Sequence, residues 1–300
     1  MNTEKIYEEL LDLLSKNLVT LPDKPEETPK KTLETLWYHS CNCQRTQNGK
    51  YHCPLPELTE ESFCRLKELI QKRAEGIPLA HLVGKQKFMG IDFLIDHNAL
   101  IPRKETEILG YAAVSKIKEL AFNQPIVKVI DACTGMGNLA LAFAIHEPKT
   151  SIFGADISEK AISLAQKNAR VLSLEDQVTF FHGDLLSPFQ YNKLSDSIDI
   201  ITCNPPYIST GKLNKMPEEI TKYEPKEAFN GGPFGLNIIF RLIKESVPLI
   251  KNKGWLCFEI GLGQGEGIIK IMQRNKHFGV IETGNDENGN IRAILAQINK

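Results

Sequence analysis

Residues 127–138 read VKVIDACTGMGN, an apolar strand pattern that runs directly into a loop with two glycines. Glycine at positions 135 and 137 lets the backbone turn sharply and pass close to a ligand. Strand and helix patterns then alternate to about residue 274, which predicts a parallel sheet covered by helices on both faces. Position 140 is alanine where a dinucleotide fingerprint has its third glycine, and that position tolerates alanine, so the loop alone leaves a nucleotide site open.

Two acidic residues follow the next two predicted strands. Asp156 ends the strand IFGAD, about 20 residues after the glycines, where a carboxylate can accept hydrogen bonds from ribose hydroxyls. Asp184 lies in HGDL after the third strand, where it can reach an adenine amine while Leu185 packs on the ring. Either acid alone is more often a helix cap. Together with the glycine loop they resemble the S-adenosylmethionine site of class I methyltransferases.

The tetrapeptide Asn204-Pro205-Pro206-Tyr207 follows an apolar strand pattern and is the predicted catalytic loop. An amide or aromatic amine nitrogen is a poor nucleophile because its lone pair is delocalised. A site that alkylates it must therefore accept hydrogen bonds from both N–H groups and aim the freed lone pair at the methyl group. The side-chain oxygen of Asn204 and the carbonyl of Pro205 can be these acceptors. The prolines fix the backbone in advance, and the ring of Tyr207 offers a flat surface.

The same tetrapeptide has two simpler interpretations, a stiff turn or part of a partner-docking motif. The glycine loop and the two acids favour the catalytic interpretation. Several further blocks resemble the HemK/PrmC family of protein-glutamine N5-methyltransferases, which modify peptide chain release factors. These blocks are AEGIPLAHL (74–82), LIPRKETE (100–107), GD (183–184), NPPYI (204–208), EP (224–225), GG (231–232), GL (235–236) and FEIG (258–261) with QGE (264–266).

The resemblance implies a set of site residues. The donor, S-adenosyl-L-methionine, would be bound by Cys133, Thr134, Gly135, Met136, Gly137, Asp156, Asp184, Leu185 and Asn204. The catalytic loop Asn204, Pro205, Pro206 and Tyr207 would hold the glutamine amide. Two departures from the family are Met136, where the loop usually has serine or threonine, and Cys133, where it usually has glycine.

Three classes of substrate are candidates. RKETE (103–107) favours a release factor, whereas CTG (133–135) also resembles the sister group that methylates a ribosomal-protein glutamine. An adenine N6-methyltransferase would use the same tetrapeptide, since adenine carries a planar, conjugated amine. It would be expected to need a basic recognition face, which a formal net charge of -1 argues against. A protein that only senses the donor is a further class, and the intact Asn204 and Tyr207 count against it.

The resemblance also implies the domain organisation. We expect an N-terminal helical substrate-recognition domain over residues 1–80, a connecting β-hairpin over 81–103, and the methyltransferase domain over 104–300. That last domain would be an α/β, class I Rossmann-like fold with a mostly parallel seven-stranded sheet. Asn288-Gly289 is a strong hairpin signal, so the last strand is predicted to run antiparallel.

Composition favours a soluble, cytoplasmic protein without a membrane span. Charged residues make up 24% and hydrophobic residues 42% of the 300 residues, an ordinary globular balance. Seven scattered cysteines, an odd number, do not look like a disulfide framework. The near-neutral charge makes direct nucleic-acid binding unexpected.

The segment 39–53 carries His39, Cys41, Cys43, His52 and Cys53. Zinc accepts such ligands, but the spacing lacks the paired Cys-x-x-Cys of robust zinc sites. We therefore expect a loop between two helices and no metal.

Overall fold

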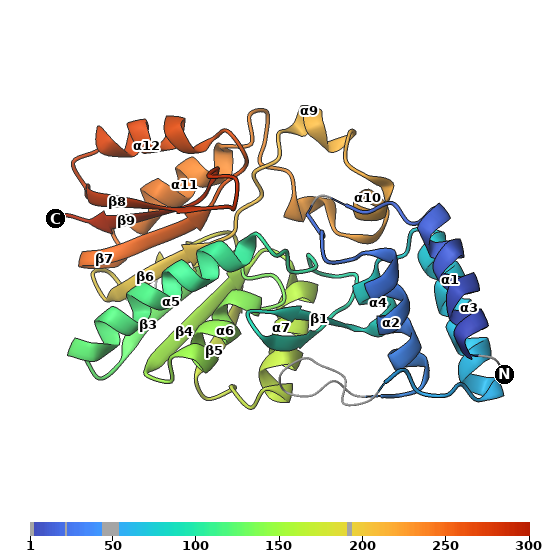
Figure 1. Ribbon diagram of the computed structural model, residues 1–300. Helices are drawn as coiled ribbons and strands as arrows, with labels where there is room; N and C mark the ends of the chain where they lie inside the picture. The colour runs from blue at the N-terminus through green and yellow to red at the C-terminus, as the bar shows by residue number, and fades with distance from the viewer. Residues whose placement is uncertain (1–2, 22, 44–53, 191–193) are drawn as a thin grey trace. The chain divides into compact units, whose positions relative to one another are not determined.

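The computed structural model describes residues 3–21, 23–43, 54–190 and 194–300. The chain forms two compact units: Met1–Gln86 with Pro217–Tyr223, and Lys87–Met216 with Glu224–Lys300 (Figure 1). The first unit is helical and contains α1 (Thr3–Asn17), α2 (Pro29–Ser40), α3 (Glu60–Ala74), α4 (Leu79–Val83) and α10 (Glu218–Tyr223).

Apolar side chains at helical spacing form the core of the first unit. This core consists of Leu10, Leu14, Leu33, Leu36, Trp37, Leu66 and Ile70. Thr59 caps α3 by accepting a hydrogen bond from the Ser62 backbone N–H at 3.1 Å. Arg73 is buried and donates to Glu27 at 3.0 Å and to Glu219 at 2.8 Å, while Lys24 donates to Glu219 at 3.1 Å. This ion cluster holds α10 in the helical unit.

A two-stranded hairpin, β1 (Lys85–Phe88) and β2 (Ile91–Leu94), follows α4. Its two connecting residues, Met89 and Gly90, have φ values of 48° and 85°. Positive φ at both positions is the requirement of a type I′ turn, the tight turn whose twist matches that of paired strands.

The second unit is an α/β domain on a seven-stranded sheet of order β5-β4-β3-β6-β7-β9-β8. Its strands are β3 (Val127–Ala132), β4 (Thr150–Asp156), β5 (Val178–His182), β6 (Ile198–Cys203), β7 (Ile250–Glu259), β8 (Phe278–Asn285) and β9 (Ile291–Ile298). Its helices are α5 (Thr106–Asn123), α6 (Asn138–His146), α7 (Glu159–Val171), α8 (Ser187–Gln190), α9 (Thr210–Leu213), η1 (Lys226–Ala228), α11 (Asn237–Ser246) and α12 (Gly265–Gln273).

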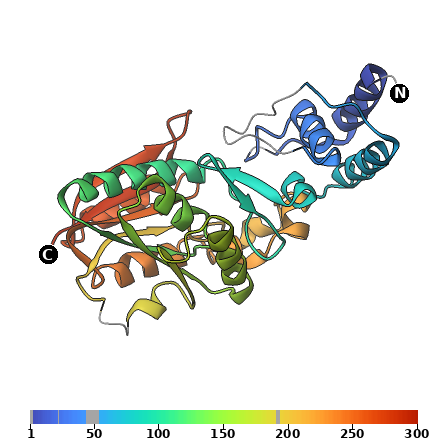
Figure 2. The ribbon, with the colours of Figure 1, turned by 90° about the horizontal axis from the view of Figure 1, so that it is seen from below.

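The strands from β5 to β7 pair in parallel, and β9 pairs antiparallel with both β7 and β8. The predicted α/β class, the seven strands and the antiparallel last strand are therefore confirmed. Helices cover both faces of the sheet, and Figure 2 shows the green helix α5 and the orange helix α11 on opposite sides of it.

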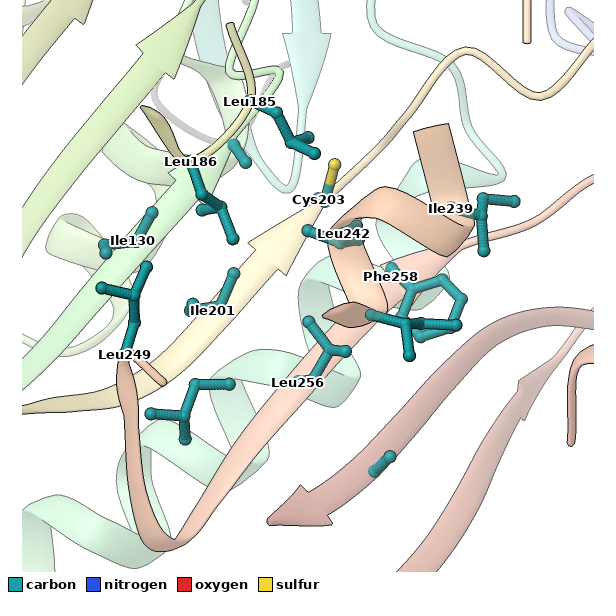
Figure 3. Packing of buried hydrophobic residues seen from close by; sticks show 14 of the residues in the cluster. Ile130, Leu185, Leu186, Ile201, Cys203, Ile239, Leu242, Leu249, Leu256 and Phe258 are labelled. Atoms are coloured by element: carbon teal, nitrogen blue, oxygen red, sulfur yellow. The ribbon is translucent and has the colours of Figure 1, made fainter. Parts of the chain in front are cut away.

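Alternate residues of the central strands build the core beneath α11. Ile130, Ile201, Leu256 and Phe258 point into one cluster with Ile239 and Leu242 of α11 (Figure 3). Because side chains alternate across a strand, the neighbouring residues face the other layer. The buried cluster makes the sheet a rigid support, and the site lies at the carboxyl ends of its strands.

Candidate active site

A pocket of about 590 Å³ opens at the carboxyl ends of strands β3 to β6. This volume is in the range of small-molecule and cofactor sites. Of the predicted site residues, the pocket is lined by Cys133, Thr134, Gly135, Asp156, Asp184, Leu185, Asn204 and Pro206. The other walls include residues 98–100, Pro102, Arg103, Pro225, Ala228 and Ile238. The chain thus brings the ends of four strands, β3 to β6, and two more distant segments to one cavity.

The side chain of Asp131 anchors the glycine loop after β3 through hydrogen bonds. This fully buried carboxylate accepts a hydrogen bond from the Thr134 hydroxyl at 2.6 Å and from the Thr202 hydroxyl at 2.7 Å. These two bonds tie the loop to the neighbouring strand β6. Gly135 has φ 55°, and a Cβ built on it meets no atom within 4 Å. The loop therefore leaves open space in the pocket where a ligand can approach the backbone.

Asp156, the last residue of β4, has both carboxylate oxygens oriented by backbone N–H groups. Oδ2 accepts from Gly135 at 2.8 Å and Oδ1 accepts from Ser158 at 2.9 Å. Burial raises the pKa of Asp156, and the Ser158 and Gly135 N–H groups oppose that shift. Each oxygen retains a lone pair. The carboxylate is thus preset to accept hydrogen bonds from a ligand in the pocket.

Asp184 and Leu185 form the next wall. Asp184 receives two hydrogen bonds from the Arg241 guanidinium, at 3.2 Å to Oδ1 and 3.0 Å to Oδ2. This fork-to-fork pairing engages both oxygens, so an adenine amine would share Asp184 with Arg241. Leu185 is buried, with φ 54°, and presents an apolar surface beside it.

Asn204 and Pro206 of the tetrapeptide also line the pocket. The Asn204 side-chain amine donates to the Thr106 hydroxyl at 3.1 Å. The Tyr207 hydroxyl donates to Glu259 at 2.9 Å, and the Tyr207 carbonyl accepts from Gln264 at 3.2 Å. A Cβ on Gly235 would come within 2.1 Å of that carbonyl, so only glycine allows this close approach. The loop is therefore braced on several sides.

Four predicted site residues are not among those that line the pocket. They are Met136, Gly137, Pro205 and Tyr207. Met136 has an exposed fraction of 1%, and its backbone carbonyl accepts from Asn168 at 3.2 Å. The methionine in place of a small loop residue is therefore accommodated in the core and does not fill the pocket.

The block 100–107 contributes contacts to which sequence reasoning assigned no role. Arg103 donates to Glu224 at 2.6 Å, and the Ile101 N–H donates to the same carboxylate at 3.0 Å. Thr106 accepts from Asn204, and Glu107 accepts from the Met89 N–H at 2.8 Å. The sequence feature that could have indicated these contacts is the block IPRKETE, in which polar residues follow a short apolar run.

No group of three or more His, Cys, Asp or Glu side chains among the described residues is arranged to hold a metal ion. His39, Cys41 and Cys43 belong to that part of the chain, whereas the predicted loop residues His52 and Cys53 lie outside it. Within the described ranges, no helix is both long and apolar enough to cross a membrane.

The strand order, the glycine loop and the pocket at the strand ends define a Rossmann-like methyltransferase. The Methyltransferase domain family matches residues 124–278, and the PrmC N-terminal domain family matches residues 12–84. The chain is 35% identical over 242 residues to a release factor glutamine methyltransferase of Bacillus cereus, a match that covers 81% of this chain and 84% of that protein. The chain belongs to the release factor glutamine methyltransferase family.

A second relative agrees with this assignment, and a solved structure shares the fold. A release factor glutamine methyltransferase of Rhodopirellula baltica is 36% identical over 237 residues, covering 79% of this chain and 78% of that protein. The N-terminal domain of human METTL16, solved in complex with SAH, matches with a TM-score of 0.53 at 17% identity. That match covers 93% of this chain and 98% of that one, and it shows the fold alone.

Proposed function

We propose that this protein transfers a methyl group from S-adenosyl-L-methionine to the side-chain amide nitrogen of a glutamine in a peptide chain release factor. The observation that carries the proposal is that Asp156 and Asn204 line one pocket. One is suited to a donor's ribose and the other to a planar nitrogen. The names of the relatives supply the class of substrate.

The residues of the pocket fit this donor. The open space at Gly135 leaves room for a ligand against the backbone, and Asp156 offers two oriented oxygens for a diol. Ile157 and Leu185 provide apolar surface for a flat ring, and Asp184 lies beside them. S-adenosyl-L-methionine supplies a methyl group on a sulfonium sulfur, which leaves as a neutral thioether when the amide nitrogen is alkylated.

The chain's own residues would act mainly by positioning. In this proposal the Asn204 side-chain oxygen, which lines the pocket, accepts one N–H group of the glutamine amide. The Pro205 carbonyl would accept the other and the ring of Tyr207 would support the amide plane, although neither residue is among those that line the pocket. A strong general base is not required, because the nitrogen becomes acidic once alkylated and releases its proton to solvent. Holding the nitrogen at the donor supplies most of the rate.

The helical unit matched by the PrmC N-terminal domain would bind the release factor. The protein is expected to act in the cytoplasm, where release factors function, and without contact with nucleic acid. Cys133, Met136 and Gly137 remain proposed as donor-binding residues.

The test offers three substrates side by side. Purified protein and labelled S-adenosyl-L-methionine are incubated with a release factor, a ribosomal protein and an adenine-containing DNA duplex. Mass spectrometry is expected to find one methyl group on a glutamine of the release factor. A methyl group on the ribosomal protein or the duplex, with none on the release factor, would overturn the proposal.

A further inference from the structure

The side chain of Gln264 joins three loops of the α/β domain. Its Nε2 donates to the Tyr207 carbonyl at 3.2 Å and to the Gly235 carbonyl at 3.3 Å. Its Oε1 accepts from the Gly261 backbone N–H at 2.8 Å. Tyr207 belongs to the loop after β6, Gly235 precedes α11, and Gly261 and Gln264 lie between β7 and α12. One amide group therefore makes three hydrogen bonds among segments that are distant in the sequence.

The partners of Gln264 allow only one orientation of its amide group. A backbone N–H only donates, and a carbonyl oxygen only accepts. With the amide turned by half a rotation, its NH2 group would meet the Gly261 N–H and its oxygen would meet the two carbonyl oxygens. Both encounters are repulsive, so the NH2 group is held against the carbonyl oxygens of Tyr207 and Gly235.

Two prolines remove backbone donors from the catalytic loop. Pro205 and Pro206 have no N–H, so these positions cannot bond a neighbouring segment through a backbone donor. Carbonyl groups and side chains must hold the loop instead, and the Tyr207 carbonyl does so with Gln264. The Tyr207 hydroxyl donates to Glu259 at 2.9 Å. Tyr207 is thus held at its backbone and at the far end of its ring by the end of β7 and the loop that follows it.

Glycines allow these loops to contact Tyr207 closely. A Cβ on Gly235 would lie 2.1 Å from the Tyr207 carbonyl oxygen, and a Cβ on Gly261 would lie 3.1 Å from Cδ2 of its ring. Because the ring packs directly against the Gly261 backbone, a shift of the loop that carries Gln264 would also displace the ring.

We propose that Gln264 is a positioning residue that sets the place of the catalytic loop for methyl transfer. Gln264 is not among the residues that line the pocket, so it acts through the Tyr207 carbonyl. Asn204 and Pro206, which do line the pocket, belong to the same short loop and move with it. A displacement of about 1 Å at a reacting group can lower the rate about 100-fold. This inference rests on the role proposed above for the loop.

Two substitutions of Gln264 separate its contacts. Gln264→Glu keeps an oxygen for the Gly261 N–H and places its second oxygen against the carbonyls of Tyr207 and Gly235, whereas Gln264→Leu removes all three hydrogen bonds. A positioning role predicts a kcat roughly 10- to 100-fold lower in Gln264→Leu. At about pH 8 the loss in Gln264→Glu should be at least as large, because repulsion replaces two hydrogen bonds. The donor dissociation constant, measured by calorimetry, should change less than about threefold in both variants.

A structural role confined to the turn 261–264 predicts a different order. That turn needs the bond from the Gly261 N–H, which Gln264→Glu retains and Gln264→Leu loses. A glutamate variant less impaired than the leucine variant would therefore overturn the inference. A leucine variant with the wild-type kcat would also overturn it. Thermal melting verifies that each variant is folded.

Gln264→Glu also has a pH profile that a packing role cannot produce. A protonated carboxyl has one O–H donor and one acceptor oxygen, so it can bond the Tyr207 carbonyl and the Gly261 N–H together. With an ordinary carboxyl pKa of about 4.3, roughly one sixth of these side chains are protonated at about pH 5. The kcat of the variant, relative to that of the wild type at the same pH, should therefore rise at least about twofold between pH 8 and pH 5. A ratio independent of pH would overturn the inference, even if the leucine variant does not fold.

NMR tests the contact independently of methyl transfer. Tyr207-Ile208 is the only Tyr-Ile pair in the sequence, so protein labelled with carbonyl-13C tyrosine and 15N isoleucine gives a single signal for this carbonyl. Its 13C shift should move upfield in Gln264→Leu, because the carbonyl loses a hydrogen bond. An unchanged shift would overturn the inference whether or not a release factor is methylated. Transfer to the ribosomal protein or the duplex instead would overturn only the proposed function, and the Gln264 series would then be measured on that substrate.

Discussion

The Arg103 guanidinium donates to the buried carboxylate of Glu224 at 2.6 Å and joins segments 121 residues apart in the sequence. The same guanidinium donates to the Ile101 carbonyl at 2.9 Å, and the Ile101 N–H returns to Glu224 at 3.0 Å. This closed ring of contacts holds residues 98–103 beside residues 225–230, and both segments supply pocket walls.

Replacing Glu224 with alanine should be strongly destabilising. The change removes the acceptor for both the Arg103 guanidinium and the Ile101 N–H in an environment where the Glu224 side chain is 0% exposed. Breaking a buried ion pair in this way typically costs about 3–5 kcal/mol of the free energy of unfolding. Urea denaturation of Glu224→Ala and the wild type measures that difference.

An exposed ion pair of the same kind is the control. Arg170 and Glu175 lie 3.4 Å apart with side chains 62% and 60% exposed. Because solvent screens such a pair, Glu175→Ala should cost less than about 1 kcal/mol. Equal losses in the two variants would contradict the role given to the buried ring.

Asn204→Ala should abolish transfer while leaving the donor in place. The substitution removes the acceptor that faces the substrate amide, and one such group typically accounts for about 100- to 1000-fold in kcat. Single-turnover assays measure the loss, and calorimetry should find the donor dissociation constant changed less than about threefold. A variant that fails to bind the donor at all would refute the separation of the two roles.

Asp156→Ala should have the opposite effect to Asn204→Ala: it should weaken donor binding and change kcat much less. Two charge-assisted hydrogen bonds to the ribose would be lost, which corresponds to a rise of roughly 10- to 100-fold in the donor dissociation constant. At saturating donor, kcat should fall much less than in Asn204→Ala. Unchanged affinity, with the variant shown to be folded, would contradict the ribose assignment.

The sequence predicted the fold wherever the signal was local. The hairpin turn at Asn288-Gly289 depends on neighbouring residues alone, and the hairpin of β8 and β9 is present. The insertion of β9 between β7 and β8 is a long-range pairing that no local pattern encodes. Helix α10 belongs to the helical unit although it comes late in the sequence. Its Glu219 pairs with Lys24, which lies 195 residues away in the sequence.

The residues of the candidate site also fall into two groups, those that the sequence predicts and those that only the structure reveals. Gly135, Asp156 and Asn204 could be predicted because strand ends of a parallel sheet converge at one edge. The contact of Thr106 with Asn204 spans 98 residues, and that of Arg103 with Glu224 spans more. Such partners have ordinary surroundings in the sequence, so only the fold reveals them.

Asp131 is a buried acid, and its protonation should make the free energy of unfolding depend on pH. Desolvation raises its pKa from 3.8 to about 6, although the Thr134 and Thr202 hydroxyls and the Ala140 N–H oppose the shift. A carboxyl whose pKa is higher in the folded state favours folding most fully below its unfolded pKa. That contribution is lost as the pH rises through the folded value of about 6.

Asp131→Asn isolates this titration because asparagine keeps the shape and has no charge to lose. From pH 4 to pH 7 the wild type should lose up to about 3 kcal/mol of unfolding free energy relative to the variant. Urea denaturation at several pH values measures the difference. Any constant offset from altered hydrogen bonds to Thr134 and Thr202 cancels, since only the slope with pH is compared. Asp176→Asn, a change at an exposed position, provides the baseline. A wild-type curve parallel to that of Asp131→Asn over this range would mean that burial does not hold the Asp131 proton.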